Sequence, residues 1–271
     1  MNKLSEAIIL GQYIEKESIL HRLDPRTKLV SMISIMVWFV MIQSVAEYVL
    51  ATIFIFFLLF ASNVSLRYYW KSLRPILFIL LFTGVYNAFL TKGEIVLWEW
   101  SVFHLTQEGI HQGIRFAWRI VLLIFMASIL TFTTKPLMLT AGLERLLKPL
   151  SRFGVPVEQF SLMVTIAIRF IPTIVSEFDR IVLAQKARGI DVKEHSFFQR
   201  VYLYIPMLIP LLFSLIQRAE TLAEAIDSRV YGKGKNRTSY RSFQLSAADY
   251  RGLTIVHLFV VTGVFWSIYF V

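Results

Sequence analysis

The stretch from Leu29 to Ala61 carries one charged residue, Glu47, and is apolar almost throughout. As a single helix it would be about 50 Å long at about 1.5 Å per residue, well beyond a hydrocarbon core of about 30 Å. We therefore expect it to fold back at the polar pair Gln43 and Ser44, giving two short membrane passes. A single soluble core could not bury this much apolar surface, because 56% of the 271 residues are hydrophobic and 15% are aromatic.

Basic residues flank this hairpin on both sides, and positive charge near membrane spans favours the cytoplasmic side. The flanking residues are Arg22, Arg26 and Lys28 before the hairpin and Arg67, Lys71 and Arg74 after it. Residues 75–90 then lead outward, the acidic segment 91–109 lies outside, and residues 110–133 return. The alternating residues around Trp98, Trp100 and Phe103 predict a short hairpin at the external interface.

These patterns predict an all-α integral membrane protein of the cytoplasmic membrane, with about five transmembrane helices and three cytoplasmic amphipathic or coupling helices. We expect a cytoplasmic N-terminal segment at 1–28, four transmembrane helices in 29–133, cytoplasmic helices in 134–252 and a last transmembrane helix at 253–271. The N-terminus is then cytoplasmic and the C-terminus outside. No cleaved signal peptide is indicated, since charged residues interrupt the first 28 positions.

Composition removes several classes of function. The chain has no cysteine, which excludes disulfides, thiolate metal sites and cysteine nucleophiles. The five histidines are scattered without metal-ligand spacing, so neither a metal site nor a catalytic residue is expected. The net charge of +10 is better explained by cytoplasmic loops facing anionic lipid and protein partners than by nucleic acid.

The cytoplasmic part contains helix signals at three places. Lys135-Pro136 opens an amphipathic helix that ends near Gly154, because proline suits the first helical position. A second helix runs from Pro156 to Gly189, and a third from Ser196, within a capping box, to about Arg229–Gly232. The hinge candidates are prolines inside these two long helices: Pro172, Pro206 and Pro210.

The two long helices end alike. Ala184-Gln185-Lys186-Ala187-Arg188 and Ala225-Ile226-Asp227-Ser228-Arg229 share an alanine, two variable residues, a small residue and an arginine. Arginine offers a planar, permanently charged group that can bind carboxylates, and small neighbours allow a close approach to a partner. The alternative is local: an arginine at a helix C-terminus complements the helix dipole, worth about 0.3 to 1 kcal/mol. The duplication favours docking.

Several motifs resemble the transmembrane coupling (T) component of energy-coupling factor transporters, the cobalt-transport membrane protein family. The segment His21-Arg22-Leu23-Asp24-Pro25-Arg26-Thr27-Lys28 resembles the opening signature of that family. Asp24 suits a helix cap and Pro25 its first turn, while Arg26 and Lys28 are expected among lipid headgroups. Ala187-Arg188-Gly189 resembles the first coupling signature, and Ser228-Arg229-Val230 stands where the second is expected. Since Val230 replaces a glycine, the backbone exit after Arg229 is expected to differ from that after Arg188.

The resemblance implies a complex of this chain with two ATP-binding cassette ATPases and an interchangeable S component that captures a vitamin. Arg188 and Arg229 would insert into the ATPases, and the unequal motifs favour two different ATPases. No cofactor is expected on this chain, since ATP and Mg belong to the partners, and the chain is not an enzyme by itself. The alternatives are a dedicated cobalt or nickel importer and a passive membrane scaffold. An intramembrane enzyme and a self-contained transporter are disfavoured, because converging acids and bases and inverted repeats are both missing.

Overall fold

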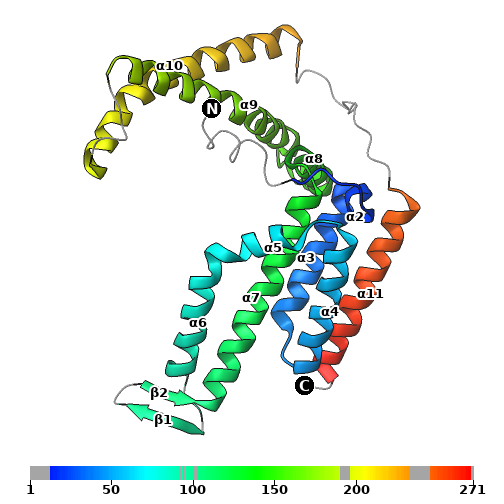
Figure 1. Cartoon of the computed structure of the whole chain (residues 1–271). Helices are drawn as coiled ribbons and strands as arrows, with labels where there is room; N and C mark the ends of the chain where they lie inside the picture. Colours follow the sequence, from blue (N-terminus) through cyan, green and yellow to red (C-terminus); the bar gives the residue numbers. More distant parts are fainter. Residues whose placement is uncertain are drawn as a thin grey trace. The chain divides into compact units, whose positions relative to one another are not determined.

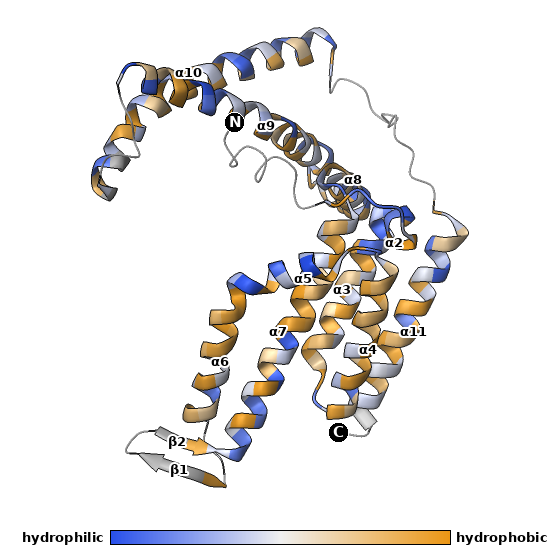
Figure 2. Ribbon diagram, viewed as in Figure 1, coloured by the Kyte–Doolittle hydropathy of each residue, from blue (hydrophilic) through white to orange (hydrophobic). Residues whose placement is uncertain are grey.

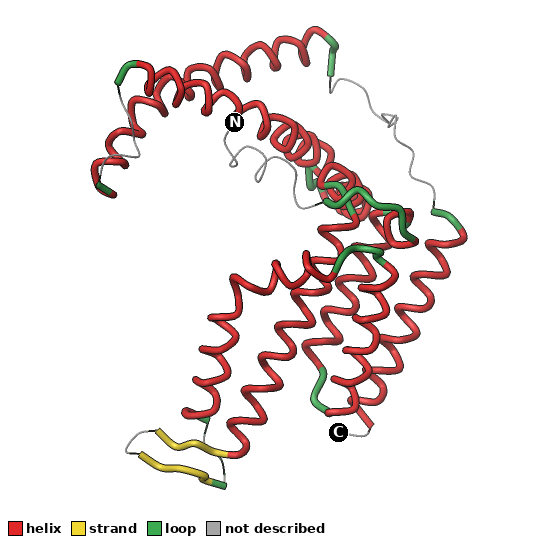
Figure 3. Tube along the Cα trace, viewed as in Figure 1, coloured by secondary structure: helices red, strands yellow, loops and turns green. Residues whose placement is uncertain are grey.

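The computed structural model describes residues 13–91, 93, 95–100, 103–189, 196–231 and 245–269 (Figure 1). The chain divides into two compact units, which are described separately. The larger unit holds residues 12–157 and 244–271, and the smaller unit holds residues 158–243 together with the first eleven residues. As Figure 3 shows, almost every described segment is helical. This confirms the predicted helical fold class.

The predicted hairpin is present in the larger unit as α3 (Pro25–Met41) and α4 (Val45–Ala61), of 17 residues each. Helix α4 starts in a capping box, in which the Ser44 side chain accepts from the backbone of Glu47 and the Glu47 carboxylate accepts from the Ser44 N–H at 3.0 Å. The second bond of the same carboxylate, from the Gln43 N–H, is also 3.0 Å long. The polar pair therefore makes the turn, as predicted.

The remaining elements of the larger unit follow in chain order. Helix α6 (Leu77–Leu90) packs against α7 (Gln107–Thr133), and a short antiparallel hairpin connects the two helices. The elements are α2 (Ile19–Arg22), α5 (Leu66–Leu73), η1 (Arg74–Ile76), α6 (Leu77–Leu90), β1 (Val96–Trp100), β2 (Phe103–Thr106), α7 (Gln107–Thr133), α8 (Pro136–Leu147), η2 (Lys148–Phe153) and α11 (Ala247–Tyr269).

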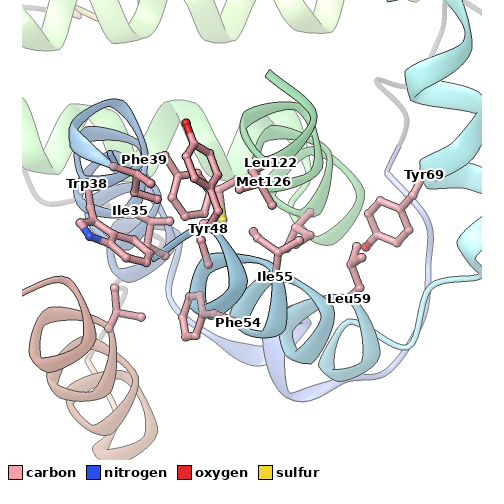
Figure 4. Packing of buried hydrophobic residues seen from close by; sticks show 14 of the residues in the cluster. Ile35, Trp38, Phe39, Tyr48, Phe54, Ile55, Leu59, Tyr69, Leu122 and Met126 are labelled. Atoms are coloured by element: carbon pink, nitrogen blue, oxygen red, sulfur yellow. The ribbon is translucent and has the colours of Figure 1, made fainter. Parts of the chain in front are cut away.

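The core of this unit lies where α3, α4, α7 and α11 meet (Figure 4). Trp38 and Phe39 of α3 are 1% and 0% exposed, and Phe259 of α11 packs edge-on against Trp38 with the ring centroids 5.1 Å apart. Phe259 also stacks on Phe54 of α4 at 4.3 Å. Gly263 lets α11 approach, because a Cβ there would collide with the Trp38 indole. These aromatic contacts hold the first hairpin and the last helix together.

Helix α6 packs on α7 through small residues. A Cβ at Gly113 would meet the Gly84 carbonyl oxygen at 2.8 Å, and one at Gly109 would meet the Asn87 carbonyl oxygen at 2.7 Å. The other faces of α6 expose large apolar side chains, and Figure 2 shows the helix hydrophobic along most of its length. A helix of this kind is suited to an apolar environment, as a membrane or a second membrane protein provides.

The described helices of the smaller unit are α9 (Val157–Ala187, 31 residues), whose first residue still belongs to the larger unit, and α10 (Phe197–Ser228, 32 residues). Both helices continue through their internal prolines, Pro172 in α9 and Pro206 and Pro210 in α10. The capping box of Ser196 and Gln199 begins α10, as predicted. A hinge at any of the three prolines stays a prediction.

Within the part of the chain that the structure describes, five segments are long and apolar enough to cross a membrane: Leu66–Leu90, Gln107–Thr133, Val157–Ala187, Tyr202–Ser228 and Ala247–Ser267. The protein is thus a multi-pass membrane protein. The set differs from the predicted spans, since it includes α9 and most of α10, while α3 and α4 are shorter. At 17 residues each, α3 and α4 reach about 26 Å and are near the lower limit for a span. The placement of α9 and α10 at the cytoplasmic face stays a prediction.

Candidate functional site

The first predicted docking tip is the C-terminal end of α9. Arg188 directly follows the last helical residue, Ala187, and its N–H donates to the carbonyl oxygens of Ala184 and Gln185 at 3.3 and 3.0 Å. Gly189 then adopts a φ of 90°, and its N–H donates to the Lys186 carbonyl oxygen at 3.0 Å. A left-handed residue at this position ends a helix and satisfies its last carbonyls. The arginine side chain is exposed at the tip.

The second tip is the C-terminal end of α10. Arg229 is the C-cap residue, and Val230 after it has a φ of 56°. The Val230 N–H donates to the Asp227 carbonyl oxygen at 2.8 Å, and the Tyr231 N–H donates to the Ile226 carbonyl oxygen at 3.2 Å. These two bonds form a Schellman motif, the common way in which a helix ends through a left-handed residue.

The expectation of a different exit after Arg229 is therefore wrong. Val230 adopts the left-handed conformation that Gly189 adopts, although a β-branched residue is an outlier there. Each arginine thus stands at a helix end, followed by a left-handed residue, and each side chain is exposed. Among the described residues, neither guanidinium makes a hydrogen bond or an ion pair. The two tips share a left-handed residue directly after the arginine, and within the described part of the chain the donors of both guanidinium groups make no bond.

The two tips differ in charge. Two residues before the arginine, the first tip has Lys186 and the second has Asp227. The helix dipole favours a cation at both ends, so a local capping role remains compatible with either arginine. The dipole does not require a small residue before the arginine, yet Ala187 and Ser228 occupy that position.

The opening signature lies in the larger unit, at the first turn of α3. The Asp24 side chain accepts from the Arg26 N–H at 2.9 Å, and Pro25 takes the first helical position, as predicted. Arg26 also lies beside Asp24, with Nε 3.4 Å from Oδ1. The expectation for Lys28 is wrong, because this residue is only 9% exposed and does not lie among headgroups. Its Nζ donates to the Thr133 carbonyl oxygen at 2.9 Å and to the neighbouring hydroxyl of Thr134.

Asp249, in the first turn of α11, also belongs to this cluster. Its Oδ1 accepts from the Asp24 N–H at 2.7 Å, while its Oδ2 accepts from the N–H and the hydroxyl of Ser246. Asp249 is 2% exposed. Together with Lys28 it joins the starts of α3 and α11 to the end of α7. No sequence signal could have paired Asp24 with Asp249, because they are 225 residues apart.

The segment before α3 is held by His21. Its Nε2 lies 3.1 Å from the Ile14 carbonyl oxygen, and its Nδ1 lies 2.7 Å from the Ser18 hydroxyl. Burial lowers the pKa of His21, opposed by the hydrogen bond to Ile14. A neutral ring can donate from Nε2 to the carbonyl and accept at Nδ1 from the hydroxyl. The Ile14 N–H in turn donates to the Phe132 carbonyl oxygen at 3.0 Å, which fastens this segment to α7.

Helix α8 lies against the same turn. A Cβ at Gly142 would meet the Pro25 side chain at 2.9 Å and the backbone nitrogen of Arg26 at 3.4 Å. The glycine therefore sets how closely α8 approaches the opening signature. The sequence analysis did not identify Gly142, because the amphipathic pattern of α8 predicts that the helix packs on another element but not which element that is.

The comparisons with known proteins bear on the whole chain. The family described as "Cobalt transport protein" matches residues 16–240. An energy-coupling factor transporter transmembrane protein of Ruminiclostridium cellulolyticum is 40% identical over 253 residues, covering 93% of this chain and 94% of the relative. Proteins of the same description from Thermosediminibacter oceani and Streptococcus equi subsp. equi are 40% and 39% identical over 94% and 96% of this chain, and over 94% and 96% of their own lengths. The chain therefore belongs to the cobalt transport protein family, as a transmembrane component of energy-coupling factor transporters.

Proposed function

We propose that this chain is the energy-coupling subunit of an ATP-driven importer, and that it passes the motion of two ATP-binding cassette ATPases to a substrate-binding S component for vitamin uptake. The observation that carries the proposal is the matched pair of tips, where Arg188 and Arg229 each follow a long helix and precede a left-handed residue. A guanidinium fixed at a helix end can bind carboxylates in a partner groove with defined geometry. Two such tips suit two partner subunits.

The unequal charge of the tips supports two different ATPases. Lys186 stands two residues before Arg188 and Asp227 two residues before Arg229, and Gly189 and Val230 follow the two arginines, so the two tips present different surfaces to their partners. ATP and Mg would be bound by the ATPases and not by this chain. The S component would contact apolar helix surfaces within the membrane, and such surfaces are plentiful on α6 and on the first halves of α9 and α10.

A dedicated cobalt or nickel importer is the second candidate, and the match to the cobalt transport protein family favours it. Affinity purification of the full chain from its own membranes in mild detergent, with mass spectrometry of the retained proteins, separates the candidates. We expect two different ATPases and one or more vitamin-type S components. A single ATPase with a metal-binding subunit would support the metal importer. If the chain were recovered without any ATPase, both importer candidates would be contradicted and the passive membrane scaffold would remain.

A further inference from the structure

Helices α9 and α10 of the smaller unit meet at an ion pair between Glu177 and Arg218. Arg218 Nη2 donates to Glu177 Oε2 at 3.1 Å, and the two side chains are 42% and 25% exposed, respectively. Phe178, next to the glutamate, stacks on Tyr204 of α10 with the ring centroids 6.3 Å apart and an interplanar angle of 27°. The crossing of the two helices is visible in Figure 1.

This ion pair lies at the same distance along the chain from both docking tips. Glu177 is eleven residues before Arg188, and Arg218 is eleven residues before Arg229. Eleven residues are about three turns of an α-helix and about 16 Å of its length. Each member of the pair therefore lies close to the side of its helix on which the tip arginine is found, and the two arms beyond the crossing are equal in length.

The two arms are also uninterrupted. All three prolines of these helices, Pro172, Pro206 and Pro210, precede the ion pair. Residues 177–187 and 218–228 contain neither proline nor glycine and are helical throughout. Helices of this composition have no intrinsic site for a kink, so each arm moves as a rigid rod. A rotation at the crossing therefore displaces the tip.

We infer that Glu177 and Arg218 are positioning residues, which fix the angle between the two arms and hence the separation of Arg188 and Arg229. The inference rests on the proposed function of these two arginines. A rotation of about 10° at the crossing moves a tip by about 3 Å, the length of a hydrogen bond. An ion pair as exposed as this one contributes little to the free energy of unfolding, so the helices should stay folded when it is removed and the arm geometry can be measured in the variants.

The absence of cysteine from the chain makes the separation measurable. Ala184 and Ala225 are exposed and lie four residues before Arg188 and Arg229. Spin labels on A184C and A225C in the full chain, reconstituted in nanodiscs, report the distance between the arms by double electron–electron resonance. We expect a narrow distribution, which broadens in E177Q and in R218Q and becomes narrow again in the charge-swapped E177R/R218E variant. E224Q, which removes an exposed carboxylate of α10 outside the pair, is the matched control and should leave the distribution unchanged.

Co-purification of the two ATPases with each variant gives the functional readout. We expect recovery to fall by about threefold or more in E177Q and R218Q and to return in the swapped variant. The positioning role would be overturned if the distance distributions of E177Q and R218Q were as narrow as that of the parent. It would also be overturned if the distribution of the swapped variant were as broad as those of the two single variants. A failure of the proposed function is distinguishable, because it would show as retained ATPases in R188A/R229A and would not alter the distance between the arms.

Discussion

At the scale of single residues, Val230 is the most informative position of the second tip. A β-branched residue with a φ of 56° is unfavourable by about 1 to 2 kcal/mol, because its Cβ crowds the neighbouring carbonyl. The two hydrogen bonds of the Schellman motif hold it there. The left-handed exit is therefore a shared property of both tips, although only one of them uses glycine.

Substitutions at Val230 should separate the exit geometry from the side chain. V230G relieves the backbone strain but increases the conformational entropy of the unfolded chain. We therefore expect a free energy of unfolding within about 1 kcal/mol of the parent value and full retention of the ATPases. V230P cannot adopt a positive φ and lacks the N–H that donates to Asp227, so retention should fall. Thermal unfolding and co-purification measure the two effects. Equal retention by V230P and V230G would contradict a role for the left-handed exit.

At the scale of helices, the capping signals were predictable from sequence and the long-range contacts were not. Asp24 with Pro25, Ser44 with Glu47 and Ser196 with Gln199 act within one turn, so the local sequence contains both partners. The burial of Lys28, the bond from Asp24 to Asp249 and the pairing of Glu177 with Arg218 depend on which helices pack together. A single sequence does not contain that information. The candidate site was thus predictable as two arginines, but its matched backbone geometry was not.

The contact of α8 with α3 gives a prediction about packing. G142A places a methyl group 2.9 Å from the Pro25 side chain and should destabilise the larger unit by about 1 to 3 kcal/mol through overpacking. Gly84 is the matched control, since a Cβ there meets nothing within 4 Å and alanine is the better helix former. Thermal unfolding in detergent should show a lowered midpoint for G142A and an unchanged or raised midpoint for G84A. Equal midpoints would show that α8 does not pack on α3 this closely.

At the scale of the whole molecule, the proposed orientation places the C-terminal ends of α9 and α10 beside the ATPases. The turn between α3 and α4 should then face outward, and η2 should lie in the cytoplasm. Single cysteines at Gln43 and Ser151, both exposed, are unique in this cysteine-free chain. A membrane-impermeant maleimide on intact cells should label Q43C and spare S151C until the cells are opened. Labelling of S151C in intact cells would contradict this orientation and indicate the opposite one.

The central claim is that Arg188 and Arg229 transmit the work of the ATPases. Its most direct test is ATP-driven uptake, in proteoliposomes, of the vitamin bound by the co-purified S component. We expect reduced uptake in R188A and in R229A and none above background in the double variant, because in the proposed function each arginine docks into one ATPase. R180A, which removes an exposed arginine of the α9 arm eight residues before Arg188, is the control and should transport like the parent. Undiminished uptake by the double variant would contradict the account.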